Sequence, residues 1–141
     1  MTTPLFENYT VYENTPSVED YVRLRKQAGL SEKAREAAEI GLKNTVFAVT
    51  LFHEETAIGM GRIIGDGGCF YQIVDIAVVP EHQKKGLGKV IMQHLMDYLD
   101  KNAPKTAYVS LIADVPADKL YEQFGFAYTA PRSVGMYKWF K

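Results

Sequence analysis

One stretch of the sequence, Val78 to Lys89, joins two segments whose apolar residues repeat with different periods. Before it, residues 70–79 are rich in β-branched and aromatic side chains, which is typical of a strand. After it, apolar residues recur every three to four positions from Leu87 onward, which indicates an amphipathic helix. Pro80 ends the strand, because proline has no N–H to give to a sheet ladder. The stretch therefore requires a fold that contains a strand–loop–helix unit.

The loop of this unit has the features of an anion site. Gly86 and Gly88 allow a tight turn and a close approach of a ligand. The helix begins at once, so its first N–H groups have no internal partner and lie at the positive end of the helix dipole. Positive charge is added by Lys84, Lys85 and Lys89. We therefore expect a phosphate or pyrophosphate ligand.

Two familiar phosphate loops do not fit this sequence. The P-loop needs G-x-x-x-x-G-K-[ST], but Gln83 replaces its first glycine and Val90 replaces the Ser/Thr that would hold magnesium. The dinucleotide loop needs G-x-G-x-x-G, but Ile91 replaces the third glycine. The pattern that fits is Gln-x-x-Gly-x-Gly, from Gln83 to Gly88. For these six residues alone, incidental glycines in a strand–turn–helix remain an alternative of similar weight.

The flanking segments favour a functional loop. The Gln-x-x-Gly-x-Gly loop resembles the acyl-CoA pyrophosphate loop of the GNAT N-acetyltransferase superfamily, residues 75–80 resemble the cofactor strand of that family, and residues 120–126 resemble its second signature. The resemblance covers residues 70–126 and is only topological before them. It implies an α/β (α+β) fold of the GNAT acyl-CoA N-acyltransferase type. That fold is a mixed, mostly antiparallel sheet of six to seven strands with a central splayed parallel pair and about four helices.

The remaining patterns predict one domain over residues 1–141, with a core of useful size. A strand–helix–strand crossover makes the strand at 106–113 parallel to the one at 70–79. Thr15 and Pro16 predict a helix start, and Ser31 predicts the cap of the next helix. The expected strands are 9–13, 45–52, 57–64, 70–79, 106–113 and 133–140, and the expected helices are 15–28, 31–42, 87–101 and 117–124.

Composition excludes several classes of function. The net charge is −1, so nothing indicates general binding to nucleic acid or to a membrane surface. No apolar run has the ~18 residues that a membrane span needs, and the first residues lack the features of a secretory signal. The single cysteine, Cys69, excludes an internal disulfide, which fits a cytoplasmic location. The three histidines have no metal-ligand spacing, so we expect no metal.

The resemblance implies how the chain would bind acetyl-CoA. The pantetheine arm would pair with backbone groups of the cofactor strand as an added strand, which requires a bulge or splay that leaves those groups free. The N–H groups of the loop would hold the pyrophosphate. Asp114 stands where many members have Asn, and Lys119 would offset the charge of this aspartate. The expected cofactor-binding residues are Ile76, Ala77, Val78, Gln83, Lys84, Lys85, Gly86, Leu87, Gly88, Lys89, Asp114 and Lys119.

The resemblance also implies an enzyme, an acetyl-CoA-dependent N-acetyltransferase with a general acid. Tyr121 matches the tyrosine of the family signature, and a phenol near pKa 10 can protonate a leaving thiolate of pKa about 8.5. The alternative for Tyr121 is simple core packing. The base is less defined, because Gln72 stands where histone-acetylating members have glutamate. Asp75 is the nearest carboxylate on the strand, and it could bind or orient groups in catalysis or could instead brace a helix.

The sequence does not identify the acceptor. The aromatic content favours a small-molecule primary amine. Arg23 and Arg25 could meet a substrate carboxylate, but a solvated helix face is the favoured interpretation. The alternatives are a catalytically silent acyl-CoA-binding module or sensor and a protein or peptide N-acetyltransferase. Dimers are frequent in the resembled family, so a homodimer is expected from the resemblance and not from the sequence itself.

Overall fold

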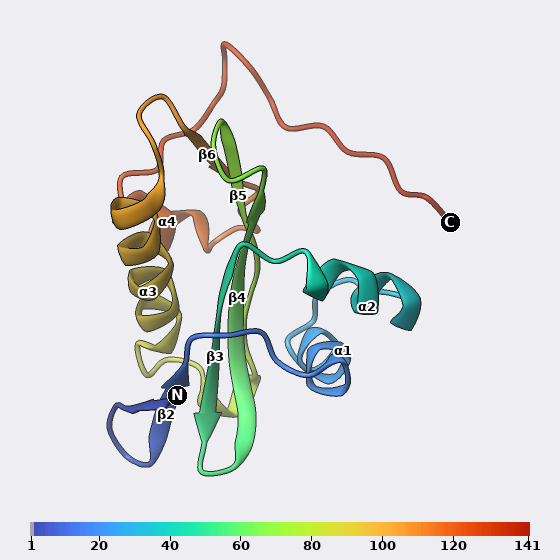
Figure 1. Cartoon of the computed structure of the whole chain (residues 1–141), viewed down its shortest axis with the longest axis vertical. Helices are drawn as coiled ribbons and strands as arrows, with labels where there is room; N and C mark the ends of the chain where they lie inside the picture. The colour runs from blue at the N-terminus through green and yellow to red at the C-terminus, as the bar shows by residue number, and fades with distance from the viewer. Residues whose placement is uncertain (1) are drawn as a thin grey trace. The chain divides into compact units, whose positions relative to one another are not determined.

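The computed structural model describes residues 2–141, which divide into two compact units, one up to Leu111 and one from Ile112 to Lys141. The first unit holds one sheet of six strands in the order β1-β2-β3-β4-β5-β6 (Figure 1). All neighbouring strands are antiparallel except β5 and β6, which are parallel. The strands are β1 Thr2–Pro4, β2 Tyr9–Tyr12, β3 Phe47–His53, β4 Thr56–Gly65, β5 Phe70–Val78 and β6 Tyr108–Leu111.

Helices cover both faces of this sheet. Helices α1 (Val18–Gln27) and α2 (Arg35–Lys43) lie on one face, and α3 (Leu87–Asn102) lies on the other (Figure 1). The second unit contains α4 (Asp118–Glu122). The mixed sheet with one parallel pair and four helices confirms the predicted α/β fold of the GNAT type.

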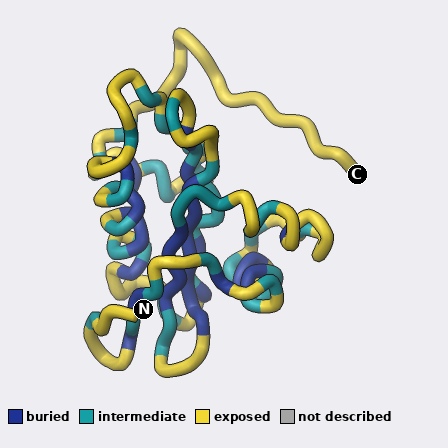
Figure 2. The backbone as a smooth tube through the Cα atoms, in the orientation of Figure 1, coloured by how far each residue is buried: buried dark blue, intermediate teal, exposed yellow. Residues whose placement is uncertain are grey.

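The core of the first unit lies between the sheet and its helices, where the tube of Figure 2 is coloured as buried. The centre of the apolar stripe of α3 is buried, as its spacing predicts, and its fully buried side chains include Ile91, Met92 and Leu95. Gly61 in β4 permits a close approach of α3. A Cβ atom at this glycine would lie 2.5 Å from the side chain of Ile91 and 2.8 Å from that of Ile76.

Two helix starts differ from the prediction. Helix α1 is capped by Ser17 and not by Thr15, since the Ser17 hydroxyl accepts a hydrogen bond from the N–H of Asp20 at 3.1 Å. Helix α2 begins at Arg35 and not directly after Ser31, because the carbonyl and the hydroxyl of Ser31 both bind the guanidinium of Arg25.

The predicted closing strand at residues 133–140 is wrong. This segment is extended, but no described strand within residues 2–141 pairs with it. An alternating apolar pattern favours extended backbone, whereas a strand also needs a neighbouring ladder. Large side chains of the segment remain exposed, among them Val134, Met136, Tyr137 and Phe140. The sequence patterns did not predict the short strand β1. This strand pairs with β2 and forms the edge of the sheet that is opposite to β6.

Candidate active site

Strand β5 has a bulge beside the residues that the resemblance assigns to the cofactor. Met60 pairs with Ala77 and Arg62 pairs with Val74, so three steps along β5 match two along β4. The extra residue brings Asp75 to a positive φ of 61°. Asparagine and aspartate are the non-glycine residues that adopt this left-handed backbone most readily. The bulge that cofactor pairing requires is therefore present.

Beyond the bulge, one edge of β5 has no strand partner in the first unit. Pairing with β6 runs from Phe70 to Ile73 and goes no further. Val79 donates its N–H to Ile58 of β4 at 2.9 Å. Since backbone groups alternate between the two edges of a strand, those of Ile76 and Val78 face away from β4.

The loop between β5 and α3 presents a row of unbonded N–H groups. Among residues 2–141, no hydrogen-bond acceptor receives the backbone N–H of any residue from Lys84 to Lys89. The first helical bond of α3 runs from Val90 to Gly86, as expected where the first turn has no internal acceptors. Gly86 has a φ of 81°, and a Cβ atom at this position would meet nothing within 4 Å. The loop thus has free donors, the positive end of α3 and open space at Gly86.

Side-chain contacts of Gln83 and His82 hold this loop. Gln83 donates its amide N–H to the carbonyl of Val78 at 2.8 Å, so this glutamine braces the loop against β5. The Tyr9 hydroxyl is hydrogen-bonded to Nδ1 of His82, and the ring of His53 lies 4.9 Å from that of His82. These contacts join the loop to β2 and β3. The cofactor role predicted for Gln83 stays a prediction, and its observed contact is with the protein.

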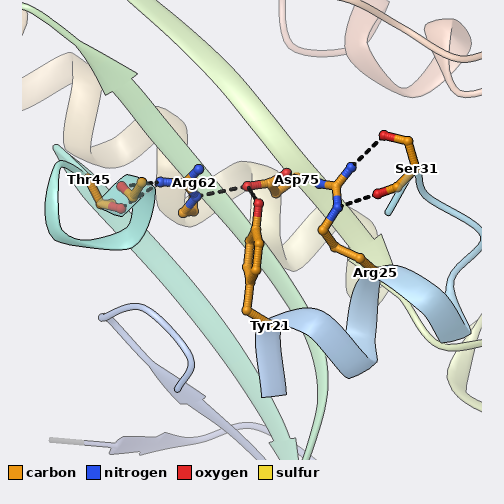
Figure 3. Close-up of polar contacts among 7 residues, drawn as sticks. Tyr21, Arg25, Ser31, Thr45, Arg62 and Asp75 are labelled. Carbon is orange, nitrogen blue, oxygen red and sulfur yellow. Dashed lines mark hydrogen bonds and ion pairs between the residues drawn. The ribbon is translucent and has the colours of Figure 1, made fainter. Parts of the chain in front are cut away.

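Asp75 is the centre of a buried ionic group, which we call the Asp75 cluster: Tyr21, Arg25, Arg62 and Asp75 (Figure 3). Its carboxylate accepts hydrogen bonds from Arg25 Nη1, from Arg62 Nε at 2.8 Å and from the Tyr21 hydroxyl at 2.9 Å. The side chains of Asp75, Arg25 and Arg62 are only 7%, 8% and 9% exposed. Burial, and then the neighbouring carboxylate, raise the pKa of Tyr21. The acid–base role of Asp75 stays a prediction.

The cluster also corrects the interpretation of Arg25. A solvated helix face was expected, but the guanidinium of Arg25 is buried against Asp75 and Ser31. Arg23 is part-buried and binds Asp20 and the carbonyl of Ala57. Neither arginine is left without a protein partner.

The second unit contains Tyr121 on α4. Its side chain is buried, yet its hydroxyl makes no hydrogen bond to any described residue. No buried side-chain oxygen within residues 2–141 lacks a partner, so the hydroxyl of Tyr121 is itself open to solvent while its ring is buried. Burial, and then the charge of Asp114, raise the pKa of Tyr121 above 10.0. Asp114 is exposed, and Lys119 lies 3.8 Å from Glu122, so neither has a contact that tests its predicted cofactor role.

The remaining features are the single cysteine, possible metal ligands and possible membrane-spanning helices. Cys69 is an exposed free cysteine. No group of three His, Cys, Asp or Glu side chains within residues 2–141 could hold a metal ion. Over the same residues, none of the helices has the length and apolar character that a membrane span requires.

Comparison with solved structures gives a close relative of unassigned function. A crystal structure from methicillin-resistant Staphylococcus aureus, described as a protein of unknown function and a probable acetyltransferase, is 52% identical with a TM-score of 0.90. The match covers 94% of this chain and 99% of the other. Glucosamine-6-phosphate N-acetyltransferase from Arabidopsis thaliana has the same fold, with a TM-score of 0.71 and 17% identity over 96% of this chain and 100% of the other.

A curated relative has a named activity. The ribosomal protein bS18-alanine N-acetyltransferase of Escherichia coli strain K12 is 30% identical over 91 residues, which are 64% of this chain. The chain spans 60% of the length of that relative.

A family model supplies the assignment. The model described as "Acetyltransferase (GNAT) family" matches residues 9–126, which include both units in part. The match contains the glycine loop, the bulged strand and Tyr121, the features on which the predicted resemblance depends. The chain therefore belongs to the acetyltransferase (GNAT) family.

Proposed function

We propose that this protein is an acetyl-CoA-dependent N-acetyltransferase that transfers an acetyl group to the primary amine of a small molecule. The observation that supports this most directly is the row of unbonded N–H groups from Lys84 to Lys89 next to the unpaired edge of β5. A catalytically silent acyl-CoA-binding module is the alternative. The hydroxyl of Tyr121 is open to solvent and is not engaged by any described residue, so it is available as a proton donor and favours the enzyme.

The residues of the first unit fit the two polar parts of coenzyme A. Unbonded N–H groups at the start of α3 suit a pyrophosphate, and Gly86 leaves the space that a phosphate would enter. The N–H and carbonyl groups of Ile76 suit an amide-containing arm that lies along β5 as an added strand. The carbonyl of Val78 is already bonded to Gln83, so at this residue the N–H is the available group.

Acetyl-CoA supplies the acetyl group as an activated thioester. The protein must accept the amine in its neutral form, which is about one part in a thousand near pH 7 for an amine of pKa ~10. The backbone N–H of Ile76 or Val78 is proposed to polarise the carbonyl that gains charge. As the C–N bond to the amine forms and the C–S bond breaks, Tyr121 is proposed to give its hydroxyl proton to the leaving thiolate. The proton that the amine releases restores the phenol through solvent. The raised pKa of Tyr121 keeps its proton in place at neutral pH.

A second acceptor class has specific support. The E. coli relative acts on an alanine of ribosomal protein bS18, so the acceptor of this chain could instead be the amino terminus of a protein. Such an acceptor has an α-amino group of pKa near 8, of which a larger fraction is neutral at pH 7 than for an alkyl amine. The homodimer and the cytoplasmic location stay predictions.

The experiment that tests the function is acetyl-CoA turnover, measured as free thiol release, against a panel of amines at mildly alkaline pH. The panel holds arylalkylamines, polyamines, amino acids, aminoglycosides, a peptide with amino-terminal alanine, and the same peptide with a blocked amino terminus and an internal lysine. Release above the no-amine background with one small-molecule class supports the proposal. Release only with the alanine peptide supports the protein acceptor. Acetyl-CoA binding without any release supports the silent module, and absence of binding refutes all three.

A further inference from the structure

We propose that the Asp75 cluster is a positioning device that holds the bulge of β5 and so determines which backbone groups Ile76 and Val78 present. This inference rests on the proposed function, because those groups are the ones assigned to the cofactor. It makes Asp75 a positioning residue and not a proton acceptor in the reaction.

Backbone conformation is the first argument. Asp75 lies in the bulge with a φ of 61°. A left-handed conformation in a residue other than glycine costs about 1–3 kcal/mol and persists only where the surroundings impose it. The surroundings of Asp75 are two guanidinium groups and one phenol, all bonded to its carboxylate. Within β5, these three bonds fix the side chain of the residue whose backbone is left-handed.

Occupancy of the carboxylate is the second argument. A general base must come within hydrogen-bond distance of the proton that it takes. The carboxylate of Asp75 already accepts from three donors, and its side chain is 7% exposed. Both guanidinium groups also lie against the Tyr21 ring, with 5.7 Å from Arg25 and 5.6 Å from Arg62 to the ring centroid. The carboxylate is thus enclosed by its partners and not presented to a substrate.

The outer contacts of the cluster reach the segment after α1 and the end of α2. Arg62 Nη1 donates to the carbonyl of Gly41 at 3.1 Å and to the hydroxyl of Thr45 at 2.8 Å (Figure 3). On the other side, Arg25 binds the carbonyl and the hydroxyl of Ser31. One network of hydrogen bonds therefore joins the bulge of β5 to the segment after α1 and to the end of α2.

The test compares Asp75→Asn, Arg62→Gln and their combination. Arg35→Gln is the matched control, because Arg35 forms exposed ion pairs with Glu19 and Glu39 in the same unit. Acetyl-CoA affinity is measured by calorimetry. We expect each single cluster variant to raise the Kd for acetyl-CoA about tenfold, within the range of coupling between contacting residues. Because both residues act through the same cluster, the Kd of the double variant should not exceed the higher of the two single-variant values. The control should keep the wild-type Kd.

Hydrogen exchange provides a readout that needs no ligand. The N–H of Val79 is bonded to Ile58 beside the bulge, and that of Glu54 is bonded to Asn8 far from it. Cluster variants should accelerate exchange at Val79 and leave Glu54 unchanged. If Asp75→Asn does not fold, Tyr21→Phe removes one hydroxyl, keeps the ring between the arginines and should give the same changes to a smaller extent.

A base and a positioning residue give opposite results. If Asp75 were the base, Asp75→Asn would lower kcat about 10²- to 10⁴-fold and remove one limb of its pH profile, with an unchanged Kd and with Arg62→Gln nearly active. That pattern, or unchanged exchange at Val79 in every cluster variant, would overturn the inference. A wild-type protein that does not bind acetyl-CoA would refute the proposed function, and exchange at Val79 would still decide whether the cluster holds the bulge.

Discussion

Replacing Gly86 by alanine separates the role of the loop in binding from its role in folding. Gly86 has a φ of 81°, and a Cβ atom there would meet nothing within 4 Å. Gly29, which follows α1, is a matched control with a φ of 78° and the same open surroundings. Alanine at either position should cost about 1–2 kcal/mol of stability, since both glycines have left-handed backbone. Urea denaturation should therefore give similar losses for the two variants.

Acetyl-CoA binding should distinguish the two variants. At Gly86 the new methyl group occupies the space beside the free N–H groups of the loop, where the pyrophosphate is proposed to lie. We expect Gly86→Ala to weaken acetyl-CoA binding about tenfold, or about 1.4 kcal/mol, and Gly86→Glu to abolish it by clash and charge repulsion. Gly29→Ala should bind like the wild type. If calorimetry gave wild-type affinity for both Gly86 variants, the loop would not be the phosphate site.

Three further predictions concern the acid, the core and one turn. Tyr121→Phe should lower kcat about 10²-fold with unchanged acetyl-CoA affinity. In the wild type, the raised pKa of Tyr121 should place the alkaline fall of kcat above pH 10. An unaltered kcat in the variant would show that Tyr121 only packs in the core. Leu95→Ala leaves a cavity at a fully buried site and should lower the free energy of unfolding, measured by urea denaturation, by about 2–5 kcal/mol. Ile40→Ala at an exposed site should lower it by less than about 0.5 kcal/mol. Equal losses would contradict the assigned core. The N–H groups of Phe70 and Gly68 hold the pKa of Asp66 in the folded protein below 3.8. The ionised carboxylate therefore stabilises the fold above pH 3.8, and this contribution is lost as the pH falls through the pKa of the folded state. Asp66→Asn should reduce the free energy of unfolding at pH 7 by a difference that shrinks below pH 3.8, and a difference that is constant with pH would refute this.

The loop could be predicted from the sequence because its determinants are adjacent in the chain. Pro80, the glycines at 86 and 88 and the start of α3 lie within a few residues of one another, and each has a local effect on the backbone. The parallel orientation of the strands at 70–79 and 106–113 followed in the same way from the crossover between them. Where the sheet was misjudged, at residues 133–140, the error concerned pairing, which depends on distant segments and not on local pattern.

The Asp75 cluster could not be predicted from local patterns. Arg25 and Arg62 are 50 and 13 residues from Asp75, and the Tyr21 hydroxyl comes from 54 residues away. A charged residue on an amphipathic helix normally lies in solvent, and this general tendency made the wrong interpretation of Arg25 the favoured one. The available signal was an aspartate inside a mostly apolar strand, since a buried charge requires partners.

The missing side chain of Gly61 has a consequence for sequence evolution in this family. Helix α3 can lie close to β4 because Gly61 has no side chain. A Cβ atom at Gly61 would fall 2.5 Å from the side chain of Ile91 and 2.8 Å from that of Ile76. Two packed side chains at such distances must shift or shrink before this glycine can change. Relatives with alanine or serine at this position should therefore have smaller residues at the positions of Ile91 or Ile76. The three positions are expected to vary together, so that a substitution in the sheet is accepted only after a compensating one in the helix or in the neighbouring strand.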